Sequence, residues 1–149
     1  MNTKALLLEV IDCAFDKQSW HGPHLMSAIR GVRAKQAAKV VMGRKSIWQQ
    51  VLHAAYWKHR ILNKLTGTTP FDRQGSNWPK LPKDLTESSW RADVEFLRAE
   101  HAQLRRAIDS LPTKRLDPKT VWRIHGVAAH DLYHAGQIKL LRRLIASAD

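Results

Sequence analysis

Residues 117–147 read DPKTVWRIHGVAAHDLYHAGQIKLLRRLIAS, and this stretch predicts a long helix. Asp117 can accept a hydrogen bond from the first turn of the helix, and Pro118 suits the first helical position, which needs no backbone N–H. Further along, Ile138 and Leu141 recur at helical spacing. An apolar stripe of this kind indicates a face that packs into a core. The sequence therefore predicts a helix near 118–147 with one face buried against other helices.

Three other long segments show helical spacing of apolar residues, each with a residue near its start that suits a cap. They lie near residues 3–16, 46–66 and 87–110, with Thr3, Ser46 and Thr86 as the capping residues. A short helix is expected over residues 24–29, and the basic stretch 32–44 reads as a connector. Strand patterns are nearly absent. The sequence therefore predicts an all-α fold, a four-helix bundle that forms one domain over residues 1–149.

Residues 67–85 hold two glycines and three prolines and predict a long irregular loop. Such a loop is unusual in a compact domain and is a candidate lid or wall of a site. We expect Trp78 in this loop to plug a gap, and Trp20, at a break between helices, to form a pocket wall. Three more of the six tryptophans are expected in the core, namely Trp48, Trp57 and Trp90.

The charge of the chain is strongly positive, with 25 Lys and Arg against 13 Asp and Glu and a net charge of +12. Between residues 17 and 71 the sequence has ten basic residues and no acidic one. This excess favours anionic partners. The basic residues are spread singly, without an arginine-rich tract or a nucleic-acid motif. We therefore expect a small anionic molecule or a solvated face, and no specific nucleic acid.

The composition also limits the setting of the protein. Cys13 is the single cysteine, which excludes an internal disulfide and a cysteine-based zinc cluster. No apolar run approaches the ~20 residues that a membrane helix needs. Acidic residues interrupt the apolar N-terminal segment, which is not typical of a signal peptide. A cytoplasmic location without a membrane partner is the expectation.

Two of the eight histidines, His130 and His134, lie four residues apart on the predicted last helix. This spacing places both imidazoles on one helix face, the face that continues into the apolar stripe. Buried imidazoles are costly to leave without a partner, and divalent zinc, nickel, copper and iron all suit imidazole. The alternative is that both histidines form hydrogen bonds to neighbours in the core. The pair by itself lacks a third ligand.

Other patterns compete for the same residues. The sequence His130-Asp131-x-x-His134 is similar to the H-E-x-x-H pattern of zinc peptidases, but aspartate is too short for the usual general base, and no third ligand follows. Glu-x-x-His pairs of a ferritin-like di-iron site are absent. Asp131 points about a quarter-turn from His130 and is expected in the outer shell of a site or at the surface.

On the second long helix, His53 shares a mixed polar and aromatic side with Tyr56 and Arg60, which could line a pocket.

Three stretches together resemble the DinB-like superfamily of small bacterial helical-bundle proteins. Residues 20–31 read WHGPHLMSAIRG, residues 46–57 read SIWQQVLHAAYW, and residues 126–138 read GVAAHDLYHAGQI. The last is the most specific of the three, and the resemblance spans essentially the whole chain in order. It implies a four-helix bundle with one divalent metal ion, held by a histidine of the second long helix and an HxxxH pair of the last. Those positions are His53, His130 and His134.

The resemblance implies an open three-histidine site but does not fix a reaction. Zinc or nickel is the expected metal, with iron and manganese as further options. Some relatives are thiol-dependent transferases or isomerases that use a low-molecular-weight thiol as cosubstrate, and a metal-dependent hydrolase is a second enzymatic possibility. The alternative is a metal-binding stress-response or interaction module without turnover. No catalytic side chain is assigned.

The second long helix also indicates two kinds of partner, an anionic substrate and a second copy of the chain. Arg60 is the first choice to attract an anionic substrate, and Tyr56 could donate a hydrogen bond at the site. Apolar and aromatic residues surround the second long helix, and relatives pair through helices, so a homodimer is expected.

Overall fold

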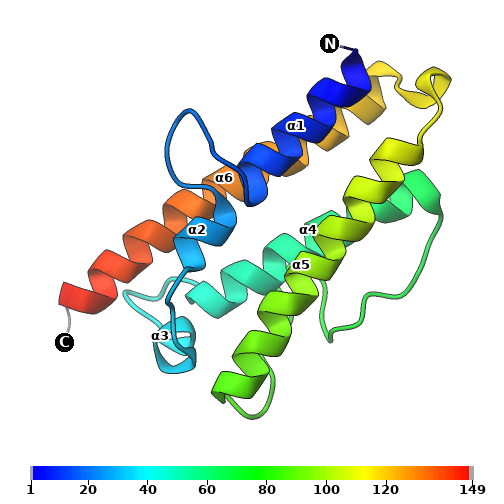
Figure 1. Cartoon of the computed structure of the whole chain (residues 1–149). Coiled ribbons are helices and arrows are strands. Elements are labelled where there is room, and N and C mark those ends of the chain that lie inside the picture. The colour runs from blue at the N-terminus through cyan, green and yellow to red at the C-terminus, as the bar shows by residue number, and fades with distance from the viewer. Residues whose placement is uncertain (1, 148–149) are drawn as a thin grey trace.

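The computed structural model describes residues 2–147 and contains six α-helices. Their bounds are α1 Thr3–Phe15, α2 Leu25–Ile29, α3 Ala34–Ala38, α4 Ile47–Thr66, α5 Glu87–Ser110 and α6 Pro118–Ser147, and a 3₁₀ turn covers Thr113–Arg115. No β-strand occurs among the described residues. The four long helices lie alongside one another, and the short α2 and α3 lie toward one end of the bundle (Figure 1). The predicted all-α helical fold is confirmed.

Capping residues fix the starts of the long helices. The Ser46 hydroxyl accepts the backbone N–H of Gln49 at 3.2 Å, while the Gln49 side chain accepts the Ser46 N–H, which completes a capping box. Asp117 accepts the N–H of Thr120 at 2.7 Å at the start of α6. The prediction of Thr3 as a cap is wrong, because the Asn2 side chain accepts the backbone N–H of Ala5 and Thr3 is already helical.

The connector predicted over residues 32–44 contains a helix. Five residues, Ala34–Ala38, form α3, whose buried side chains are Ala34 and Ala37. The Glu87 carboxylate at the start of α5 accepts the backbone N–H of Ala34 at 3.0 Å and the side-chain Nε–H of Arg33 at 2.9 Å. This tertiary contact holds a turn that is too short to be stable alone or to show a clear apolar period.

The core positions α4 between α5 and α6, and α1 against α6. Trp48 and Trp90 are buried as predicted, and their indole N–H groups donate to Asp93 and to the carbonyl of Val32. Trp57 was expected in the core as well, but 38% of its surface is exposed. Trp57 lies at the edge of the buried face of α4, partly covered and partly in solvent. Helical spacing alone does not separate such an edge position from a core position.

An ion pair is buried inside this helical core. The Lys58 ammonium group contacts the Asp131 carboxylate, and their side chains are 0% and 1% exposed. The ring of Phe15 lies 4.8 Å from the Lys58 nitrogen, and His101 Nδ1 lies 3.4 Å from it. Asp131 is therefore not a surface residue, because the lysine that balances its charge comes from α4.

No helix in the described part of the chain is long and apolar enough to cross a membrane.

Candidate metal centre

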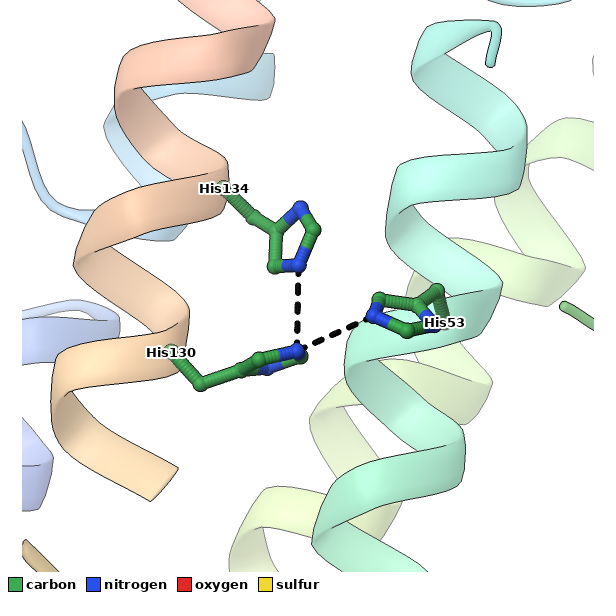
Figure 2. Close-up of side chains that lie close together, drawn as sticks. All are labelled: His53, His130 and His134. Atoms are coloured by element: carbon green, nitrogen blue, oxygen red, sulfur yellow. Dashed lines mark hydrogen bonds between the residues drawn. The ribbon is translucent and has the colours of Figure 1, made fainter. Parts of the chain in front are cut away.

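Three histidines from two helices meet at one point of the bundle. His53 comes from α4, while His130 and His134 come from successive turns of α6 (Figure 2). The Nε2 atom of His130 lies 3.0 Å from Nε2 of His53 and 3.0 Å from Nε2 of His134. Suitable ligand nitrogens of all three residues lie within 4.8 Å of one another. The structure thus brings together the three residues that the sequence resemblance implied.

The other ring nitrogens of two histidines are already engaged. Nδ1 of His53 donates to the backbone carbonyl of Asn77, and Nδ1 of His134 contacts the side-chain oxygen of Gln50. Because a carbonyl oxygen only accepts, each Nδ1 must carry the proton. In a neutral imidazole the opposite nitrogen is then an acceptor. The Nε2 lone pairs of His53 and His134 therefore both face the centre of the cluster.

Protein atoms alone leave this centre short of donors. His130 can place at most one proton on its Nε2 atom, and that proton can serve one of the two neighbouring lone pairs but not both. A buried acceptor without a donor costs about 1–3 kcal/mol. A divalent cation satisfies all three nitrogens at once, and the set of three neutral imidazoles suits zinc and nickel. The donor set therefore fits a metal ion.

Burial keeps these imidazoles neutral. It lowers the pKa of His53, partly offset by the hydrogen bond to Asn77. Burial, together with the neighbouring His53 and Lys58 charges, lowers the pKa of His130 to about 4. For His134, burial and the two neighbouring histidines lower the pKa to about 3. Neutral imidazole is the form that ligates a metal, so the lowered pKa values favour the ligating form of all three rings.

The long loop covers one side of the cluster. The indole ring of Trp78 stacks on His53, with ring centroids 3.9 Å apart and an angle of 10° between the planes. Trp57 donates its indole N–H to the Asn77 side chain at 2.8 Å, which ties the loop to α4. The loop is thus a wall of the site, as the sequence suggested. The two expected roles were assigned to the wrong tryptophans, because Trp78 forms the wall against His53 while Trp20 is fully exposed.

Comparison with protein families matches residues 20–138, most of the chain, to the DinB superfamily. The chain belongs to the DinB superfamily. The resemblance drawn from the three sequence stretches is confirmed, and the match includes every member of the histidine cluster. No curated protein and no solved structure matches this DinB protein in the corresponding comparisons.

Two further residues expected near the site of this DinB protein lie elsewhere on α4. Tyr56 packs edge-on against Phe71 and Trp57, with centroids 5.4 and 5.7 Å away. Arg60 is exposed on the surface of α4. Neither forms a hydrogen bond or ring contact with the three histidines among residues 2–147. The Tyr56 ring packs against Phe71 and Trp57 instead, and Arg60 lies seven positions from His53, about 10 Å further along the helix.

Sequence reasoning missed the residues that hold the imidazoles. Gln50 precedes His53 by three positions, so the two side chains share a face of α4, and this spacing was the available signal. Asn77 acts through its backbone carbonyl, which has no signature in a sequence. Its position depends on the path of the loop between Gly67 and Leu85.

The lowered pKa values of the DinB cluster predict an acid-sensitive fold. Each folded-state pKa lies below the unfolded value of about 6.5, so the unfolded chain binds more protons once the pH falls below that value. With metal removed by a chelator, the free energy of unfolding is expected to fall from pH 7 to pH 5 in urea titrations. The variant His134→Gln should show a shallower fall. An unfolding free energy that stays level or rises over this range contradicts the burial of neutral imidazoles.

Proposed function

We propose that this chain binds one divalent metal ion, zinc or nickel, through Nε2 of His53, His130 and His134, and uses it in an enzymatic reaction of a small molecule. The observation that carries the proposal is the meeting of three Nε2 atoms around one centre, with Nδ1 of His53 and His134 committed to outer acceptors. A divalent ion in such a site lowers the pKa of a water or thiol ligand and so supplies a nucleophile at neutral pH.

The protein's own groups have separable roles in this proposal. The Asn77 carbonyl and the Gln50 side chain fix the orientation and the tautomer of two ligands, as outer partners of metal-bound histidines generally do. The stacked ring of Trp78 excludes water from one side of His53. His130, the only partly exposed ligand, faces the opening. The site is thus rigid on the loop side and accessible at His130.

Openness favours an enzyme over a structural metal site. A structural zinc site is closed by four protein ligands, whereas a catalytic site has three and leaves a position for substrate. Among the described residues the cluster contains three histidines and no fourth His, Cys, Asp or Glu. A surface cleft of about 240 Å³ also reaches His130. Hydrolysis and S-transfer from a low-molecular-weight thiol are the two reactions that this arrangement suits.

Metal analysis followed by an activity screen tests the proposal. The purified protein, stripped with a chelator and reloaded, is expected to take up one zinc or nickel ion per chain. Thiol-transfer and ester-hydrolysis screens with and without the metal then separate the two reactions. Failure of the stripped protein to take up either ion overturns the metal site. Stoichiometric uptake without turnover in both screens favours a metal-binding module instead.

Replacing Gln50 by leucine tests the outer shell of the site. The Gln50→Leu variant keeps the size of the side chain but removes the acceptor for Nδ1 of His134, so the imidazole loses its fixed tautomer. We expect the metal dissociation constant to rise about 10–100-fold, measured by competition with a chromophoric chelator. The control is Gln103→Leu on the exposed face of α5, which should leave the constant unchanged. Equal affinities of the two variants would count against a role for Gln50.

A further inference from the structure

The cleft beside His130 has an unusual composition for a surface feature. It lies between α4 and α6 and is lined by Trp57, Trp122, Val127 and Gly126, with Arg123 and His130 on the same wall of α6. Trp122 is 74% exposed and forms the outer edge. Arg123 and His130 are seven residues apart, two helical turns on one face, so about 10 Å separates their backbone positions. One cation, two indole rings and one proposed metal ligand thus share a single groove.

We propose that this cleft binds the substrate of the three-histidine site, and that the substrate is a small aryl or branched-alkyl compound with one carboxylate group. Its apolar body would lie between the indole rings of Trp57 and Trp122, with the carboxylate at Arg123. The inference rests on the proposed function in one respect, namely that the reaction takes place at the end of the cleft where His130 lies. The binding of the apolar body and of the carboxylate stands on the cleft alone.

Charge decides in favour of an anion. Arg123 is half-buried and forms no ion pair within residues 2–147. Within α6 the single acid is Asp131, which is buried against Lys58. The Asp117 carboxylate just before the helix interacts with the charge of Arg123 at a longer range than an ion pair, and it is already engaged in capping the helix at Thr120. The basic residues of the helix are Lys119, Arg123, Lys139, Arg142 and Arg143. A guanidinium group at an apolar cleft recognises a carboxylate through charge-assisted hydrogen bonds.

The same charges argue against a second copy of the chain over this face. A symmetric dimer contact brings identical patches together. Two α6 faces would therefore place their cations against each other, in a chain with a net charge of +12. An anionic ligand neutralises Arg123 instead.

The size of the cleft limits the ligand. An apolar cavity of ~150 Å³ holds benzene, and drug-sized ligands occupy about 300–1,000 Å³. At about 240 Å³ this cleft accommodates one ring with a short chain. Gly126 contributes to the space, since a Cβ atom placed on it would meet no atom within 4 Å. A larger side chain at position 126 would fill the cleft without a clash at its first carbon.

Titration with 3-phenylpropanoate tests the cleft, with the uncharged 3-phenylpropanamide as the matched ligand. Indole N–H signals in ¹H–¹⁵N spectra report on the tryptophans, and Trp57→Phe and Trp122→Phe assign the two that line the cleft. We expect 3-phenylpropanoate to shift both of these signals in the metal-free and in the zinc-loaded protein, and to bind more tightly than the amide. Buried Trp48 and Trp90 should be unaffected.

Two substitutions locate the contacts. Gly126→Leu is expected to weaken binding of 3-phenylpropanoate at least ~10-fold, the loss that about 1.4 kcal/mol produces. Gly136→Leu is the matched control, because Gly136 lies on the exposed side of the same helix with equal room for a Cβ but does not line the cleft. Arg123→Gln should remove the preference for the acid over the amide while leaving binding of the amide unchanged.

Three outcomes would overturn the cleft as the binding site: no shift of the Trp57 and Trp122 signals, equal weakening by Gly126→Leu and Gly136→Leu, or equal binding of acid and amide. A fourth outcome would also overturn it: a dimer mass in light scattering that Gly126→Leu reduces to the monomer mass and Gly136→Leu does not would assign the face to a second copy. If the stripped protein takes up no metal but 3-phenylpropanoate binds as described, the proposed function fails and the ligand site stands.

Discussion

Replacing His134 by alanine is expected to reduce the metal content of the reloaded protein from the proposed one ion per chain to background. His134 is 3% exposed, and its Nε2 atom lies 3.0 Å from that of His130, so the variant removes a ligand from the centre of the cluster. Two ligands remain, which is fewer than the three that open zinc sites use. Elemental analysis after reloading measures the loss, and circular dichroism checks that helix content is kept.

A second alanine variant controls for changes to α6 itself. His125 lies on the same helix but is exposed and outside the cluster. His125→Ala should therefore retain full metal content, since the substitution removes an imidazole without touching the site. Metal binding by His134→Ala at the level of His125→Ala would contradict the three-histidine site.

The largest effect on stability is expected at the buried ion pair. Lys58→Met removes the ammonium group that balances the Asp131 carboxylate, and both side chains are fully buried. Lys58 contacts Oδ2 of Asp131, and Oδ1 has no hydrogen-bond partner among the described residues, so without Lys58 the carboxylate would remain alone in the core. Breaking a buried pair from one side costs about 3–5 kcal/mol of unfolding free energy. Urea unfolding in the presence of a chelator measures this loss without a contribution from metal.

Two controls separate the pair from general damage to the core. The double variant Lys58→Met/Asp131→Leu removes both charges and is expected to recover most of the loss, because an apolar pair of similar volume replaces an ion pair at little cost. Glu95→Gln breaks an exposed pair with Arg98 and should change the free energy by less than about 1 kcal/mol. If Lys58→Met is no less stable than Glu95→Gln, the pair does not support the fold.

The helices could be read from the sequence because their signals are local. Apolar spacing and the caps at Ser46, Thr86 and Asp117 depend on neighbours within a few positions, and α4, α5 and α6 begin where those residues indicate. The exception is α3, which is held by Glu87, a residue far along the chain. A helix that owes its stability to one distant carboxylate leaves little trace in its own residues.

In the candidate site, too, the residues with local sequence signals were predictable and those placed by distant contacts were not. The pair His130 and His134 follows from helical spacing, and the resemblance to a family supplied His53. The ring of Trp78 and the carbonyl of Asn77 were not predictable, because the path of a loop depends on contacts that no periodic pattern records. Lys58 was missed for a related reason, since a lysine inside a bundle is explained only by the aspartate on the facing helix.

The contact between Asn77 and His53 has a consequence for how the sequence can change over generations. The acceptor is a main-chain oxygen, which every amino acid supplies, so this hydrogen bond does not itself require asparagine at position 77. The Asn77 side chain contributes separately, because it accepts the Trp57 indole N–H that ties the loop to α4. Exchange of Gln50, by contrast, removes the acceptor for His134 outright. A substitution at position 77 is therefore expected to loosen the loop through the lost Trp57 contact, while the acceptor for His53 is still present. Insertions or deletions between α4 and position 77 are expected to break the hydrogen bond, since they move the Asn77 carbonyl away from the His53 ring.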